Sequence, residues 1–225
     1  MNRREFVVST VAAAVGLFEA SRASGQVRTI RPDLAALADQ QRLQLFNRSA
    51  SRFVDGARQG VRLSEAAGEG VAFVPGVELA NGTIELDVRG RDLAQRSFVG
   101  VAFHGVDAAT YDGIYFRPFN FRASDPVSRG HAVQYHSPPV HTWQKLRADQ
   151  PEKYERAVNP VPDPDGWFRA RVVVATPKVS VFVNDAKEPC LVVDLLSDRQ
   201  KGLVGLWVGN NSGGDFASLA ITSAV

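Results

Sequence analysis

Short runs of β-branched and aromatic residues recur along most of the chain, and Gly, Asn, Asp and Pro separate them. In Thr83–Val88 apolar and polar positions alternate, which is typical of a strand with one face in a core. Asn81-Gly82 and Asn184-Asp185 provide tight turns beside such runs. The predicted strands are Val61–Leu63, Gly70–Val74, Thr83–Val88, Phe98–Phe103, Ile114–Phe121, Ala132–His136, Phe168–Ala175, Val179–Asn184, Leu191–Leu195, Leu203–Val208 and Phe216–Ile221.

One short helix is predicted before these strands. Pro32 suits a first helical turn, and Leu34, Leu37 and Ala38 recur at helical spacing. No second helix is predicted. About ten short strands with turns between them favour an antiparallel sandwich or barrel over parallel βαβ units. We therefore predict one all-β domain over residues 43–225, preceded over residues 24–42 by a linker that contains the short helix.

The first residues follow a different pattern. Arg3 and Arg4 precede an apolar run from Phe6 to Phe18, and small residues flank Arg22. This order is typical of an export signal, and Arg-Arg-x-Phe resembles the twin-arginine export motif, with an ordinary secretory signal as the alternative. The apolar run is shorter than the roughly 20 residues that span a bilayer. We expect residues 1–23 to direct the protein to the periplasm or the medium without leaving a permanent membrane anchor.

Composition and charge narrow the class of partner. The chain is 44% hydrophobic and 22% charged, as in ordinary globular proteins. Its 26 basic and 24 acidic residues are spread along the whole chain, which argues against nucleic acid as a partner. An uncharged ligand such as a sugar suits this balance better than a polyanion. Cys190 is the only cysteine, so we interpret it as a small buried side chain.

A segment of about 30 residues between Ser137 and Trp167 lacks clear strands and carries six prolines, which is typical of a binding loop or lid. A sugar ring presents an apolar face for stacking and hydroxyls for hydrogen bonds. The ligand-binding residues predicted in this segment are Trp143, Arg147, Tyr154 and Glu155. Trp167 and Trp207 lie in or beside strands and are interpreted as core residues.

The aromatic run from Tyr115 to Arg122 supplies further ligand-binding candidates. Alternation along a strand places Tyr115 and Arg117 on one face and Asn120 and Arg122 on the other. A buried arginine must be paired, because an unpaired one would cost several kcal/mol. A structural salt bridge and a ligand contact are therefore both open for Arg117. Pro118 indicates a bulge or a sheet edge.

Polar residues at two strand ends are candidates for a cleft. His104 ends one strand, and His136 ends another on the same face as Gln134. A histidine titrates near neutral pH, so His104 or His136 is the predicted proton-transfer group if the protein is an enzyme, and Gln134 is a predicted ligand contact. The five-residue spacing of His131, His136 and His141 is not that of zinc ligands.

No metal or other cofactor is predicted. Asn210, Asn211 and Asp215 carry oxygen atoms that Ca²⁺ could use, but a polar turn explains these residues and is the favoured interpretation. Glu85 and Asp87 lie on one strand face, yet Gly90 stands where glucanases of the laminarinase type carry another Glu. We interpret both acids as solvated outer-face residues.

Four segments together resemble the concanavalin A-like lectin/glucanase superfamily, and the chain is most similar within it to the 3-keto-disaccharide hydrolase-like family. The resemblance covers the chain from about Leu43 onward. It implies a jelly roll of two antiparallel sheets, whose concave side and rim loops meet carbohydrate. A strand ending in Arg and a following strand with Gln recur in the family, at the places of Arg117 and Gln134. The acidic residue that usually follows this Gln in the family is missing here, and His136-Ser137-Pro138 stands in its place. The segments are Gly82–Asp87, Ser97–His104, Tyr115–Phe121 and Gly205–Asn210.

Three functional hypotheses follow. The preferred one is an exported jelly roll that binds a glycan or glycoside. The second is an enzyme that acts on modified sugars such as 3-keto-glycosides, by hydrolysis or elimination. The third is a protein-interaction sandwich without a small-molecule site, in which the segment after Ser137 spreads over the surface without forming a cleft.

Overall fold

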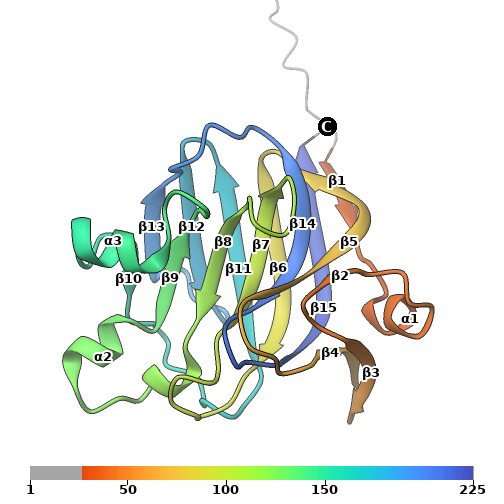
Figure 1. Ribbon diagram of the computed structural model, residues 1–225, viewed down its shortest axis with the longest axis horizontal. Helices are drawn as coiled ribbons and strands as arrows, with labels where there is room; N and C mark the ends of the chain where they lie inside the picture. The colour runs from red at the N-terminus through yellow and green to blue at the C-terminus, as the bar shows by residue number, and fades with distance from the viewer. Residues whose placement is uncertain (1–26, 225) are drawn as a thin grey trace, which may run out of the picture.

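Two antiparallel sheets lie face to face in the computed structural model, which describes residues 27–224 (Figure 1). The predicted export signal, residues 1–23, lies outside the described residues. Sheet A has the order β13 (Leu191–Asp194), β12 (Lys178–Val183), β11 (Phe168–Ala175), β6 (Gly82–Arg89), β15 (Gly214–Ala224), β4 (Arg58–Leu63) and β3 (Ala50–Asp55), with β1 (Val27–Ile30) paired to β15. Sheet B has the order β10 (Glu155–Arg156), β9 (Val133–His136), β8 (Asp112–Phe116), β7 (Val99–Gly105), β14 (Gly202–Val208), β5 (Gly70–Leu79) and β2 (Gln44–Phe46). The predicted all-β jelly-roll sandwich is confirmed.

Alternation along the strands builds the core between the sheets. In β6, Ile84, Leu86 and Val88 are fully buried and point toward sheet B, while Glu85 and Asp87 point outward. Both acids lie about 3.6 Å from the guanidinium of Arg169 on β11, as expected for outer-face residues. Every residue of β7 is buried, because side chains cover both faces of sheet B. The outer face of sheet B is therefore covered by side chains and loops, unlike the outer face of sheet A.

Each predicted strand overlaps an observed strand, and the main differences concern short elements. β1, β2, β3 and β10 were not predicted, because they are short or carry few buried residues; β1 lies inside the predicted linker. The predicted strand Ile114–Phe121 ends at Phe116, since Pro118 has no backbone N–H to donate and begins the 3-10 helix η1 (Pro118–Asn120).

The helix prediction was right for one helix and missed two. α1 (Leu34–Asp39) lies in the predicted segment, but Pro32 precedes the helix, whose N-cap is Asp33 with its side chain accepting from the Ala36 N–H at 2.9 Å. The prediction of no second helix was wrong. α2 (Pro126–Gly130) and α3 (Trp143–Asp149) are too short to show a periodic apolar face. In the part of the chain that the structure describes, no helix is long and apolar enough to cross a membrane.

Cys190 is half-buried, and its Sγ donates a weak hydrogen bond to the Val181 carbonyl at 3.4 Å. Burial raises the pKa of its thiol to about 11, so the thiolate needed for nucleophilic chemistry is scarce at neutral pH. The interpretation of Cys190 as a packing residue agrees with this environment.

Candidate functional site

One row of cross-strand neighbours crosses the outer face of sheet B. Tyr115 on β8 pairs with Gly100 on β7, and Gly100 pairs with Trp207 on β14. A Cβ on Gly100 would collide with the backbone of β8. Because that position carries no side chain, the rings of Tyr115 and Trp207 meet with their centroids 4.8 Å apart. The row continues beyond Tyr115 through Gln134 on β9 to Glu155 on β10.

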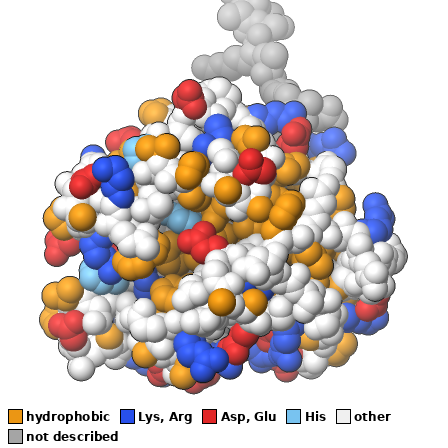
Figure 2. All heavy atoms as spheres, viewed as in Figure 1, with side chains coloured by type: hydrophobic (Ala, Val, Ile, Leu, Met, Phe, Trp, Pro, Cys, Tyr) orange, Lys and Arg blue, Asp and Glu red, His pale blue; other side chains and the backbone are white. Residues whose placement is uncertain are grey.

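A cavity of about 490 Å³ lies over this row and is called the sheet B cavity below. In Figure 2, hydrophobic side chains gather on this face over β5, β7, β8 and β14. Four aromatic residues line the cavity, and the remaining lining side chains are mostly polar or charged. The aromatic ones are Phe98, Tyr115, Trp143 and Trp207; the charged and polar ones include Glu69, Gln95, Arg96, Arg117, Asn120, Ser128, His131, Arg147, Asn210 and Asn211.

Arg147 and Arg117 meet at the end of the cavity nearest α3. Nε and Nη2 of Arg147 donate to the two carboxylate oxygens of Glu155 at 2.9 and 2.6 Å. Nη1 of Arg117 lies 3.8 Å from the same carboxylate, and Nε2 of His131 lies 3.3 Å from it. Glu155 is itself buried, so one carboxylate without access to bulk water holds two arginines in place.

Arg117 is 5% exposed and donates to three neutral oxygens: the Tyr115 hydroxyl, the Gln134 side-chain carbonyl and the His131 backbone carbonyl. Its guanidinium lies 4.8 Å from the centre of the Tyr115 ring. Burial is the main cause that lowers the pKa of Arg117, and the charge of Arg147 adds to it. Arg117 is therefore paired, as one alternative predicts, and it also lines the cavity, where a ligand contact stays a prediction.

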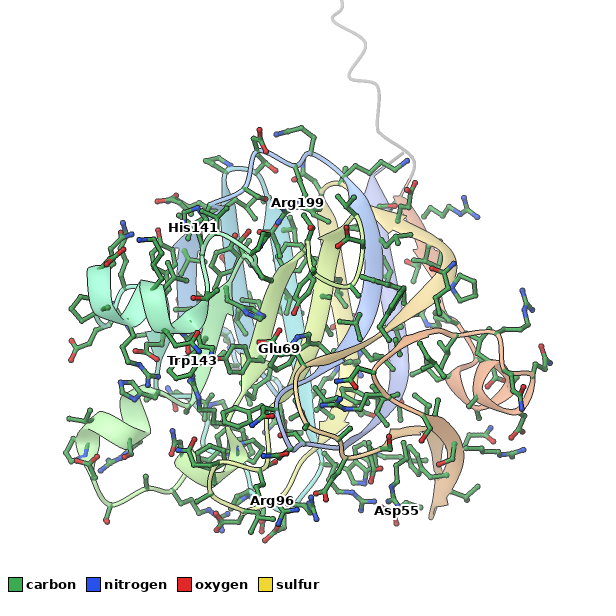
Figure 3. The ribbon with its side chains drawn as sticks, in the orientation of Figure 1. Asp55, Glu69, Arg96, His141, Trp143 and Arg199 are labelled. Atoms are coloured by element: carbon green, nitrogen blue, oxygen red, sulfur yellow. The ribbon has the colours of Figure 1, made fainter. Side chains whose placement is uncertain are left out.

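Glu69 brings an acceptor to the opposite part of the cavity. Its carboxylate accepts a hydrogen bond from the Tyr111 hydroxyl at 2.7 Å, and that hydroxyl accepts one from Nε1 of Trp207 at 2.7 Å. This chain of bonds fixes the indole that forms the cavity floor. Figure 3 shows Glu69 in front of the middle strands of sheet B, Trp143 toward α3 and Arg96 at the lower end of the face.

The polar turn after β14 forms one rim. The Asn210 side-chain oxygen accepts from the Gly68 N–H at 2.7 Å, which ties this turn to the loop that carries Glu69. Asp215 lies elsewhere, where Arg62 and Arg89 bind its carboxylate. Among residues 27–224 there is no group of three or more His, Cys, Asp or Glu side chains arranged to hold a metal ion. The turn interpretation fits Asn210, whereas it is wrong for Asp215, which lies on β15 and binds two arginines.

Neither predicted catalytic histidine lines the cavity. His136 is 1% exposed beneath the rings of Tyr111, Tyr115 and Trp207, and burial lowers its pKa to about 4. His104 is fully buried; its Nε2 is bonded to the Ala80 carbonyl at 2.8 Å. Strand-end positions suggested a cleft mouth, but side chains and loops cover both rings. Proton exchange with a ligand in the cavity is therefore not open to them in this structure.

Six of the eight predicted ligand-binding residues lie at the sheet B cavity, in two groups. Arg117, Asn120, Trp143 and Arg147 line the sheet B cavity together, although the first two lie at η1 and the other two in α3. Gln134 and Glu155 are buried behind the lining, where they hold Arg117 and Arg147.

Two predicted contacts are misplaced. Tyr154 immediately precedes β10 and is packed in the core, with its ring centroid 5.9 Å from that of Tyr135. Arg122 has a side chain that is 58% exposed and lies 3.8 Å from Asp163, away from the cavity. The chain leaves the strand at η1, so the alternation assumed for Arg122 does not apply.

Sequence reasoning also missed Glu69, Phe98 and Trp207. Trp207 was interpreted as a core residue, and its strand has buried residues on both faces, so alternation could not tell the core face from the cavity face. Glu69 lies in a loop of Gly and small residues with no motif around it. Only the pairing of β5 with β14 brings that loop over Trp207.

Structures of known proteins share this architecture, although no protein-family model and no curated protein sequence matches the chain. The carbohydrate binding module CBM66 from Bacillus subtilis is 11% identical, with 79% of this chain and 97% of that chain covered and a TM-score of 0.53. A protein of unknown function with a galectin-like fold, also from Bacillus subtilis, is 11% identical over 87% and 94%, with a TM-score of 0.57. The VIP36 exoplasmic/lumenal domain in a Ca²⁺- and mannose-bound form is 9% identical over 88% and 89%, with a TM-score of 0.54. These likenesses show that the chain has the galectin-like, concanavalin A-like jelly-roll fold.

Proposed function

We propose that this protein binds carbohydrate in the sheet B cavity. The observation that carries the proposal is the meeting, in one cavity of about 490 Å³, of the Tyr115–Trp207 floor and the Trp143 side chain with the polar groups of Glu69 and Arg147. Aromatic faces stack on the C–H face of a sugar ring, and the polar groups match its hydroxyls. The volume is in the ordinary range of small-molecule sites.

The cavity supports binding better than hydrolysis. Most glycosidases use two carboxyl groups on either side of the bond that is cut. Glu69 is the one acidic side chain among the residues that line the cavity, and both predicted proton-transfer histidines are buried. The protein-interaction hypothesis is weaker, because Trp143 and Arg147 line a cavity instead of spreading over the surface.

The structural neighbours and the sequence resemblance support the proposal at different levels. One neighbour is a carbohydrate binding module and another was solved with mannose, but at 9–11% identity they support the scaffold and not the ligand. The finer resemblance to the 3-keto-disaccharide hydrolase-like family rests on the segments around Arg117 and Gln134. We therefore include 3-keto-glycosides among the ligands to be tested, both for binding and for turnover.

Titration of the purified protein with a panel of oligosaccharides and 3-keto-disaccharides, followed by tryptophan fluorescence, tests the proposal. Saturable quenching is expected, and Trp143→Phe should change its amplitude or midpoint. Trp167→Phe is the matched control, because Trp167 stacks on Phe53, outside the lining of the cavity. Absence of saturable binding across the panel, or binding that Trp143→Phe and Arg117→Gln leave unchanged, would overturn the proposal. Chromatography of the same mixtures detects turnover, and product formation would favour the enzyme hypothesis instead.

The export of the protein is a separate proposal and rests on residues 1–23 alone. The double substitution Arg3→Lys with Arg4→Lys should keep the protein in the cytoplasm if the twin-arginine route is used. Wild-type protein should appear in the periplasm or the medium with a new N-terminus near residue 24. Export that the double variant does not change would indicate the ordinary secretory route, and full-length protein in the cytoplasm would contradict export altogether.

A further inference from the structure

The charged groups around the sheet B cavity are not balanced. Arg96, Arg117 and Arg147 line it, against the single lining carboxylate of Glu69. Arg96 has a partner in Glu65, with Nη2 3.4 Å from Oε2. The other two arginines share the carboxylate of Glu155, so the end of the cavity near α3 carries an excess positive charge.

The guanidinium of Arg147 donates only part of its hydrogen bonds to the protein. Nε and Nη2 bind Glu155, while Nη1 has no hydrogen-bond partner among the described residues. The side chain is 32% exposed and its guanidinium carbon lies 5.2 Å from the centre of the Trp143 ring. An N–H group of a cation thus remains available beside the half-buried Trp143 ring, in the wall of the cavity.

Arg117 adds a buried positive charge beside Arg147. Its direct hydrogen bonds all go to neutral oxygens, and the nearest carboxylate, Glu155, is engaged more closely by Arg147. A buried cation without its own anion is unfavourable, because it has lost its hydration without a full Coulombic return. A negative charge bound in the cavity would interact with both guanidinium groups at low dielectric, where attraction is strong.

We propose that the ligand of the sheet B cavity is an acidic sugar, whose carboxylate binds Arg147 at the Trp143 end while the sugar ring lies on Tyr115 and Trp207. The proposal rests on the carbohydrate-binding function proposed above and specifies its ligand class. A hydroxyl farther along the sugar would face Glu69, which repels a second carboxylate and so fixes the orientation. It differs from the expectation of an uncharged ligand, because the net charge of the chain does not describe the local charge of the cavity.

Matched ligands test the proposal directly. Uronate-containing oligosaccharides of several backbones are titrated into the purified protein, each beside its carboxyl-reduced neutral counterpart and beside sulfated neutral oligosaccharides. At least one uronate should bind about tenfold more tightly than its reduced form, as charge-assisted hydrogen bonds predict, and the difference should shrink in high salt.

Arg147→Gln should remove most of that preference, with a smaller loss of affinity for the reduced form, and a urea denaturation curve like that of the wild type shows that the variant is folded. Arg58→Gln is the control, because Arg58 pairs with Asp87 on the outer face of sheet A. Equal or tighter binding of the reduced forms would overturn the acidic-sugar proposal and leave carbohydrate binding intact, and so would a preference for the sulfated sugars alone. Absence of binding by every sugar, charged or neutral, would instead overturn the proposed function itself.

Discussion

Two buried carboxylates in this protein each hold two arginines, one in each sheet. In sheet A, Asp215 on β15 accepts from Arg62 at 2.6 Å and from Arg89 at 2.7 Å. In sheet B, Glu155 on β10 accepts from Arg147 at 2.6 Å and lies 3.8 Å from Arg117. The two clusters share the same chemistry, yet their surroundings differ.

The sheet A cluster is balanced by a second acid. Arg89 also donates to Asp55 at 2.6 Å, and Nε1 of Trp167 donates to the same carboxylate at 2.8 Å. The Asp215 interaction raises the pKa of Arg62, whereas burial lowers the pKa of Arg117. A second hollow of about 450 Å³ borders Asp215, but none of its lining residues is aromatic. The comparison indicates that the number of carboxylates, together with an aromatic face, separates a structural arginine cluster from one suited to a ligand.

The largest expected effect comes from removing the shared carboxylates. Glu155→Gln should lower the free energy of unfolding by about 3 to 5 kcal/mol, because it leaves Arg117 buried without any nearby anion. Asp215→Asn should cost less, about 1 to 2 kcal/mol, since the Arg62 side chain is 55% exposed and Arg89 keeps Asp55. Urea denaturation of both variants measures this difference. Equal losses would contradict the distinction between the two clusters.

The next effect is a pH dependence that belongs to the sheet B face. Burial holds the pKa of His136 at about 4, below the roughly 6.5 of an unfolded histidine. The unfolded chain therefore binds more protons between these values, and stability is lost as the pH falls through that window, by about 3 kcal/mol in all. His136→Gln should flatten the dependence of the unfolding free energy on pH from 6.5 to 4.

The pKa of His131 is also lowered, mainly by burial. The unfolding free energy of His136→Gln should therefore keep a smaller dependence on pH. An identical slope in wild type and His136→Gln would show that His136 is not the group responsible.

A smaller effect on sugar affinity should distinguish Trp143, in the sheet B cavity, from Trp167, on sheet A. Trp143→Ala should weaken sugar binding about threefold to tenfold, as expected for the loss of one stacking face. Trp167→Ala removes a tryptophan that packs between Phe53 and Arg89 in sheet A, and sugar affinity should be unchanged. Isothermal titration calorimetry with the tightest ligand of the panel measures both. If Trp167→Ala lost as much sugar affinity as Trp143→Ala, the result would contradict a binding site confined to the outer face of sheet B.

The smallest effect is expected at Arg122. Its exposed pair with Asp163 at 3.8 Å contributes little, so Arg122→Ala should change neither the unfolding free energy nor the binding free energy by more than about 0.5 kcal/mol. Calorimetry and urea denaturation check this against Arg147→Gln. A loss of binding in Arg122→Ala would return this residue to the site.

The candidate site was predictable only in part. The sequence pointed to Trp143 and Arg147 because they lie in a long Pro-rich segment without clear strands. It pointed to Arg117 because an arginine in an aromatic strand must be paired or reach a cleft. Glu69 and Trp207 did not stand out, since nothing local distinguishes a loop carboxylate or a strand tryptophan that faces a cavity. His104 and His136 were misjudged because the position of a residue at a strand end does not say what covers it.

The sequence by itself determined an antiparallel all-β fold, the positions of most strands and the helix near Pro32, because alternation and turn residues are local properties. Tertiary structure alone decided which face of sheet B stays open. The register that places Glu155, Gln134, Tyr115, Gly100 and Trp207 in one row joins residues far apart in the chain. A shift of one residue would turn each of these side chains to the other face. The cavity and its excess positive charge therefore arise from strand pairing, which no local pattern in the sequence specifies.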